Sequence, residues 1–126
     1  MNKRSILLLI AFLLLYPVGL SAQIHFAANA NAYDNNDRKV GNQYIAANIS
    51  NGSGTMTIGN LKMKAIITNS QRNEQYKMTG YSVSLSASNG KSVETTITKH
   101  DKGTYTVVIY YADGKLRYDI PASSNH

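Results

Sequence analysis

The strongest constraint on the fold is an alternation of apolar and polar residues with a period of two. It is clearest in one segment, where Tyr81, Val83, Leu85 and Ala87 alternate with Ser82, Ser84, Ser86 and Ser88. Successive side chains of a β-strand point to opposite faces, so this pattern predicts a strand with one buried and one solvated face. No comparable helical period occurs after the first 22 residues. We therefore expect the rest of the chain to be all β.

The same alternation recurs along the chain and gives an approximate strand count. We expect strands at residues 24–28, 43–49, 55–58, 61–68, 80–87 and 92–98, and a final hairpin at 104–120. About seven short strands in one small domain predict a single immunoglobulin-like antiparallel β-sandwich. A small meander β-barrel is the alternative fold. Residues 29–42, with five Asn and two Asp, break the pattern and are expected to form a loop or an N-terminal arm.

Gly-containing dipeptides separate several of these strands and predict how the strands pair. They are Gly59-Asn60, Asn89-Gly90 and Asp113-Gly114. The first and third suit two-residue hairpin loops, whereas the second needs a bulged or longer turn to keep inward residues opposite inward ones. The predicted pairings are Ile58 with Leu61, Ala87 with Val93, and Tyr111 with Leu116.

The first 22 residues indicate a secretory signal peptide. Lys3 and Arg4 precede ten residues, 6–15, that carry no charge or polar side chain, and the small residues Ser21 and Ala22 follow. A transmembrane anchor needs about 20 apolar residues, so this run is short for one. We expect cleavage near Gln23 and export. Loss of Lys3 and Arg4 leaves 11 of the 13 basic residues against 7 acidic ones, a net charge of +4.

The absence of cysteine excludes several classes of protein. A chain with no Cys has no disulfide scaffold, iron–sulfur cluster, Cys zinc site or thiol nucleophile. An exported chain of this kind fits a bacterial periplasm, cell surface or secreted fraction. The expected organisation is a signal peptide at 1–22, an N-terminal strand and Asn-rich loop at 23–42, the β-sandwich core at 43–121, and a polar tail at 122–126.

One part of the chain resembles a known group of domains. Between residues 81 and 120, alternating strands are joined by three short motifs: Asn89-Gly90-Lys91, Gly103-Thr104-Tyr105 and Asp113-Gly114-Lys115. This order is similar to small exported immunoglobulin-like domains of the Bacteroidota, including type IX secretion sorting domains. Ser21-Ala22-Gln23 is similar to the end of their signal peptides. The resemblance implies a sandwich fold and an exported location, and it transfers no functional residue.

The sequence contains no motif for catalysis or cofactor binding. There is no phosphate loop, dinucleotide fingerprint, serine elbow or zinc signature. Adjacent His100 and Asp101 are expected to lie in a turn rather than in a catalytic set. The oxygen-rich run Asp34-Asn35-Asn36-Asp37 lacks the spacing of a calcium loop and is expected to be a solvated loop. We therefore predict no enzyme activity, no catalytic residue, no metal and no cofactor.

The sharpest candidate binding surface is a cationic face. If alternation places Leu61, Met63 and Tyr118 inside, then Lys62, Lys64, Lys115 and Arg117 point outward. Tyr110 falls opposite Arg117 in the predicted hairpin, where a cation–π contact would be worth ~0.5–1 kcal/mol. Such a face would suit an acidic glycan, an anionic lipid or an acidic exported protein. Nucleic acid is not expected as a partner.

These observations predict an exported, non-enzymatic β-sandwich that acts as an adhesion, binding or assembly module. One alternative is a small β-barrel that carries an apolar ligand, which would require an internal cavity. Another is a secreted protein inhibitor that acts through a loop at residues 69–75. An enzyme would need a pocket in which a His and a carboxylate converge.

Overall fold

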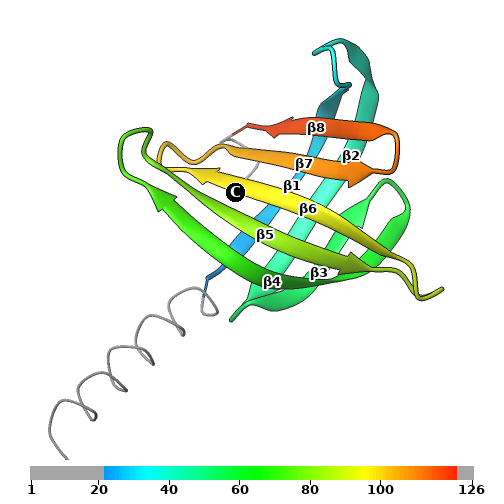
Figure 1. Ribbon diagram of the computed structural model, residues 1–126, viewed down its shortest axis with the longest axis horizontal. Helices are drawn as coiled ribbons and strands as arrows, with labels where there is room; N and C mark the ends of the chain where they lie inside the picture. Colours follow the sequence, from blue (N-terminus) through cyan, green and yellow to red (C-terminus); the bar gives the residue numbers. More distant parts are fainter. Residues whose placement is uncertain (1–21, 122–126) are drawn as a thin grey trace, which may run out of the picture.

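The chain forms one antiparallel sheet that closes on itself as a barrel (Figure 1). The computed structural model describes residues 22–121, so all but the last residue of the predicted signal peptide and the whole of the predicted polar tail lie outside the described residues. The strands follow one another around the barrel in sequence order. They are β1 (Ile24–Tyr33), β2 (Lys39–Ser50), β3 (Ser53–Ile58), β4 (Leu61–Asn73), β5 (Met78–Ser86), β6 (Ser92–His100), β7 (Tyr105–Tyr111) and β8 (Gly114–Ile120). The described residues hold no helix long and apolar enough to cross a membrane.

The predicted immunoglobulin-like sandwich is wrong, and the alternative, a small meander barrel, is the fold observed. Alternation requires that one face of each strand be covered. Two sheets packed face to face meet this requirement, and so does one sheet that curls over its own inner face. The pattern alone therefore could not distinguish the two folds. The final hairpin, counted as one segment, supplies two strands and brings the total to eight.

The inside of the barrel is filled by side chains of the predicted inward parity. Its largest fully buried residues are Tyr118, Ile24, Ile45, Ile49, Met56, Leu85, Ile97, Ile109, Ile120, Val83, Val107 and Thr95. An eight-stranded barrel is only just wide enough for side chains to fill it. Within the described core, Thr95 is the one buried polar residue, and its Oγ1 has no hydrogen-bond partner.

The Asn-rich segment is mostly strand, so the predicted loop at residues 29–42 is wrong. β1 continues to Tyr33 and β2 starts at Lys39, which leaves a short turn at 34–38. In β1 the alternation is carried by Ala30 and Ala32, which are buried, between Asn29 and Asn31. Asn and Ala have low β-propensity, and this hid the strand.

The strand registers agree with the turn signals in part. Ile58 pairs with Leu61, which confirms the two-residue Gly59-Asn60 loop. The turn at Asn89-Gly90 is longer than two residues, as predicted, but Val93 pairs with Leu85 rather than with Ala87. In the last hairpin Tyr111 pairs with Gly114, so Leu116 lies opposite Ile109. Both errors are shifts of two residues, which preserve the face on which each side chain lies.

Candidate binding groove at the barrel seam

The barrel closes by its shortest ladder, between β1 and β8. β1 pairs with β2 over its whole length but with β8 only from Asn31 to Tyr33. Residues 24–30 of β1 therefore have no strand partner on the β8 side among the described residues. We call this junction the seam. It follows from the stagger of strands that a closed barrel requires.

One end of the seam is held by side chains of the β1–β2 and β7–β8 hairpins. The Arg117 guanidinium donates to Asp37 Oδ1 at 2.7 Å and lies 4.7 Å from the centre of the Tyr33 ring. The backbone N–H of Lys115 donates to Asn35 Oδ1 at 2.9 Å. We call these residues the hairpin lock. It explains why the two hairpin tips meet at this end of the seam.

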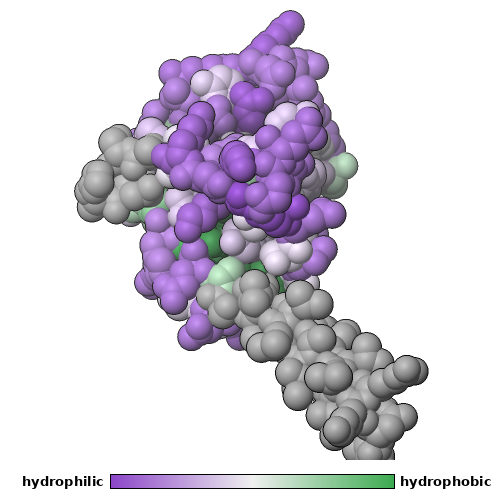
Figure 2. Space-filling view, turned by 90° about the vertical axis from the view of Figure 1, so that its left-hand side faces the viewer, coloured by the Kyte–Doolittle hydropathy of each residue, from purple (hydrophilic) through white to green (hydrophobic). Residues whose placement is uncertain are grey.

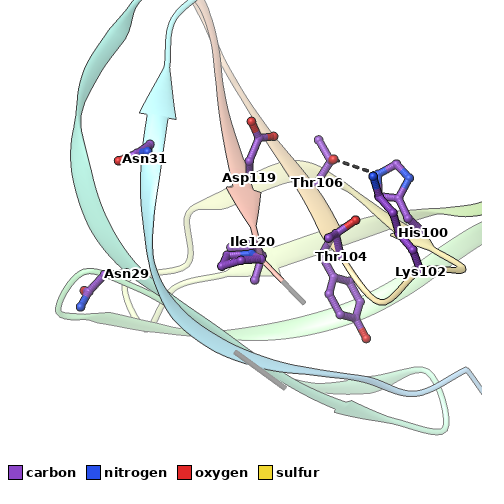
Figure 3. A pocket seen from close by; sticks show the side chains of 10 residues that line it. Asn29, Asn31, His100, Lys102, Thr104, Thr106, Asp119 and Ile120 are labelled. Atoms are coloured by element: carbon purple, nitrogen blue, oxygen red, sulfur yellow. Dashed lines mark hydrogen bonds between the residues drawn. The ribbon is translucent and has the colours of Figure 1, made fainter. Parts of the chain in front are cut away.

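The other end of the seam opens into a groove of about 470 Å³ (Figure 3). Its walls come from β1 on one side and from the β6–β7 turn, β7 and β8 on the other. The groove is lined by Asn29, Asn31, His100, Lys102, Thr104, Tyr105, Thr106, Asp119, Ile120 and Pro121. We call it the seam groove. Its side chains are mostly amides, hydroxyls and charges, which suit a polar ligand.

Two aromatic residues separate the seam groove from the core. The Tyr105 and Phe26 rings are in contact, with centroids 4.8 Å apart, and both side chains are buried. Burial raises the pKa of the Tyr105 hydroxyl, and a hydrogen bond from the His25 backbone opposes this shift. The phenol therefore spans the seam from β7 to β1. The groove is in consequence an outer surface feature, separate from the filled interior.

A histidine and a carboxylate both line the groove, as an enzyme site would require, but they are not paired. His100 Nε2 lies 3.0 Å from Thr106 Oγ1, and the Asp119 carboxylate forms an ion pair with Arg117 at 3.5 Å. In a nucleophile–base pair, a third group orients the imidazole through its other nitrogen. No described carboxylate makes that contact with His100. The arrangement suits hydrogen bonding to a ligand better than proton transfer. His100 is half-buried at the end of β6 rather than solvated in a turn.

The predicted cationic face is not assembled as one surface. Lys62 and Lys64 lie on β4, whereas Lys115 and Arg117 lie on β8, four strands away in a ring of eight (Figure 1). The two pairs therefore project from opposite sides of the barrel. Met63 and Tyr118 are buried as predicted, whereas Leu61, at the start of β4, is exposed rather than buried. Strand parity does not say where a strand lies around the barrel.

The predicted partners of Arg117 also differ from those observed. Tyr110 lies opposite Lys115 rather than Arg117, and the ring that Arg117 covers belongs to Tyr33. The two-residue shift of the last hairpin separates Tyr110 from Arg117. Since Arg117 is held by two carboxylates and a ring, it contributes little free positive charge to a ligand.

The oxygen-rich run at residues 34–37 serves the turn between β1 and β2. Asp34 Oδ1 accepts hydrogen bonds from the backbone N–H groups of Asn36 and Arg38 at 2.9 and 3.0 Å. These bonds, above all the one from Arg38, hold the pKa of Asp34 below its ordinary value. Within residues 22–121 no group of three or more His, Cys, Asp or Glu could hold a metal ion.

The seam groove was not predicted from the sequence, since its residues come from three separate segments of the chain. One signal was available: Pro121 directly follows the last strand, and proline ends a ladder because it has no N–H. That signal marks where β8 stops, but not which strand would be left without a partner. Comparisons of this chain with protein-family models, curated proteins and solved structures found no match.

Proposed function

We propose that this protein is an exported, non-enzymatic binding module that holds its ligand in the seam groove on the outside of a filled barrel. The observation that carries this proposal is the short β1–β8 ladder, beside which polar side chains of separate strands line one open groove. Export rests on the sequence of residues 1–22, with its basic start and apolar run.

The filled interior argues against the carrier alternative. Barrels that carry a small ligand keep space for it inside, whereas here large side chains from all eight strands are buried in the interior. Figure 2 views the side of the barrel that carries the β4–β5 tip and the β6–β7 turn. That surface is almost entirely hydrophilic, and hydrophobic residues show only in small patches. A polar ligand on the outer surface fits this molecule better than an apolar ligand inside.

The alternative of a secreted inhibitor was based on a predicted loop at residues 69–75, and most of that segment is not a loop. Residues 69–73, predicted as part of a loop, continue strand β4, and only a short turn follows. Arg72 in that strand is held by Asp101, with two contacts of 2.8 Å. A strand fixed in this way lacks the reach of an inhibitory loop. An acidic glycan or an anionic lipid suits the separate Lys62–Lys64 pair on β4 rather than the groove.

The absence of cysteine allows a direct test by single-site labelling. Thr104→Cys places a photo-crosslinker at the groove, and Ser84→Cys places the same reagent on the outer face of β5, at a position that does not line the groove. Each labelled protein is mixed with the exported fraction of the source cells, with acidic glycans, or with vesicles of anionic lipid. We expect saturable crosslinking from Thr104→Cys and none from Ser84→Cys. Equal crosslinking from both positions, or none from either, would contradict the proposal.

A further inference from the structure

We propose that the ligand of the seam groove is a neutral oligosaccharide, with one part of the sugar chain among the amides and hydroxyls of the groove and a neighbouring sugar ring stacked on Tyr44. The inference rests on the proposed function and names its ligand class. A sugar ring has hydroxyl groups at its edge and C–H groups on its faces. A site for it needs polar groups that both donate and accept hydrogen bonds, and an exposed aromatic ring beside them.

The formal charges that line the groove balance. Among the described residues that line it, Lys102 supplies the one positive side chain and Asp119 the one carboxylate. The Asp119 carboxylate pairs with Arg117, whose charge is shared with Asp37. The groove therefore gives no preference to an anion or to a cation, and this favours an uncharged ligand.

The uncharged polar groups of the groove suit the recognition of hydroxyls. Figure 3 shows Asn29 and Asn31 on β1, across the groove from Thr104 and Thr106. A side-chain amide both donates and accepts, as does a hydroxyl, so each can pair with a sugar hydroxyl in either direction. Among the described residues, no hydrogen bond occupies the Asn29 amide, and Asn31 uses only its oxygen, which accepts from Asn42 Nδ2 at 3.4 Å.

The strand register places an exposed aromatic ring beside these amides. On the outer face of the barrel, Asn29 pairs with Tyr44 of β2, and Asn31 pairs with Asn42. Side chains that lie opposite each other in an antiparallel pair have Cβ atoms about 4.5–5.5 Å apart. Tyr44 is 44% exposed, whereas the next residue, Ile45, is fully buried, so the Tyr44 ring lies on the outer face. The amide of Asn29 therefore adjoins both the groove and the ring.

The surface on the other side of Tyr44 leaves room for a stacked sugar. The next outward pair along these two strands is Ala27 with Ala46, which presents only two methyl groups beside the ring. Residues 24–31 of β1 and 42–50 of β2 contain no Lys, Arg, Asp or Glu. An uncharged sugar chain that leaves the groove can follow this part of the sheet without removing water from a charge.

Titration with oligosaccharides tests the ligand class. The probes are linear hexasaccharides of glucose, mannose, galactose and N-acetylglucosamine, with a hexasaccharide of galacturonic acid as the acidic control. We expect at least one neutral probe to bind saturably and to shift the NMR signals of the Asn29 side-chain amide and the Tyr44 ring. Added salt should leave its Kd unchanged, because no attraction between charges contributes. Absence of binding by every neutral probe, or tighter and salt-dependent binding of the acidic one, overturns the proposal.

Matched variants test where the sugar binds. Tyr44→Ala should weaken binding of the neutral probe about tenfold, the loss expected for one aromatic contact. Tyr44→Phe keeps the ring and should bind like the wild type. Tyr76→Ala removes a tyrosine that is even more exposed, at 64%, in the turn between β4 and β5, and should have no effect. Asn29→Ala should weaken binding about fivefold through the loss of one or two hydrogen bonds. Unchanged binding by both Tyr44→Ala and Asn29→Ala overturns the proposal.

The crosslinking experiment separates this inference from the proposed function. The neutral hexasaccharide that binds should compete with the ligand captured by labelled Thr104→Cys. If Thr104→Cys crosslinks saturably while no neutral hexasaccharide binds or competes, the proposed function stands and this inference fails. If Thr104→Cys captures nothing and no neutral probe binds, both fail.

Discussion

The barrel wall and the seam are closed by different means. In the wall, β5 forms nine residue pairs with β4 and nine with β6, whereas at the seam β1 and β8 form three. Each region also has one arginine that joins separate segments, Arg72 in the wall and Arg117 at the seam. Their side chains are equally exposed, at 36% and 35%.

The difference shows how a small barrel distributes its stability. In the wall the backbone ladder fixes the strands, and the contacts of Arg72 with Asp101 and Glu74 add to a structure already determined. At the seam few backbone hydrogen bonds are available, so the side-chain contacts of the hairpin lock contribute a larger share of the interactions that close the barrel. Regions with few backbone pairs open most readily, and binding surfaces are often drawn from them.

Core truncation should cost more in the wall than at the seam. Ile109 and Ile120 are both 1% exposed, but Ile109 has paired strands on both sides and Ile120 lines the groove. We expect Ile109→Ala to cost ~2–5 kcal/mol and Ile120→Ala to cost less, because residues beside the groove can relax into the space. Thr106→Ala, on the opposite parity, should cost much less than either. Urea unfolding measures all three, and equal losses for the two isoleucines would contradict the contrast.

Two strand glycines should respond oppositely to an added methyl group. A Cβ on Gly54 would collide with the backbone carbonyl of Asn48 and lie 2.8 Å from the Cα of Ile49, whereas a Cβ on Gly41 meets nothing within 4 Å. We expect Gly54→Ala to destabilise the protein by roughly 1–3 kcal/mol. Gly41→Ala, in the hairpin next to the seam, should be neutral or stabilise by about 0.4–1 kcal/mol. Thermal melts that ranked the two variants in the reverse order would contradict the close approach of Gly54 to the backbone of β2.

The two arginines provide a matched test of closure. Arg117→Met removes ion pairs with Asp37 and Asp119 and a cation–π contact with Tyr33, and should cost roughly 1 kcal/mol. It should also speed amide exchange at Asn31 and Tyr33, which pair with β8. Arg72→Met should leave exchange at the seam unchanged, because the ladders on both sides of β5 remain. Faster seam exchange in Arg72→Met would show that the wall and the seam open together.

The sequence predicted which face of each strand is buried more accurately than it predicted where each strand lies around the barrel. Alternation correctly placed Val83, Leu85 and Ile97 inside, because side-chain period is a local property of a strand. It could not predict closure into a barrel, since a sandwich buries the same faces. Nor could it predict that Lys64 and Arg117 stand on opposite sides, because that depends on the number and order of strands between them.

The candidate site depended even more on long-range register. The groove exists because β1 extends past the end of β8, and the predicted hairpin register was two residues in error at that strand. Residues 29–32 were excluded from the strand because Asn and Ala are weak β-formers. The part of β1 that forms one wall of the groove was therefore not predicted as a strand. Turn residues were more reliable where the loop was shortest, as at Gly59-Asn60.

The smallest expected effect is a pH dependence that separates the two regions. In the wall, hydrogen bonds from Arg72 lower the pKa of Asp101 below its ordinary value of 3.8, and at the β1–β2 turn backbone amides lower the pKa of Asp34. A carboxylate whose pKa is lower in the folded than in the unfolded state stabilises the fold above pH 4, and this contribution is lost as the pH falls through the folded value.

Arg72→Met should therefore raise the pKa of Asp101 toward its ordinary value and leave that of Asp34 unchanged, which an NMR titration of the two carboxyl carbons measures directly. The stability difference between the wild type and Arg72→Met should be largest near neutral pH and shrink as Asp101 becomes protonated. Both carboxylates are exposed, so solvent screening keeps the effect small. A shift in the pKa of Asp34 in Arg72→Met would mean that the wall and the β1–β2 turn are electrostatically coupled. That result would contradict the independence of the two regions.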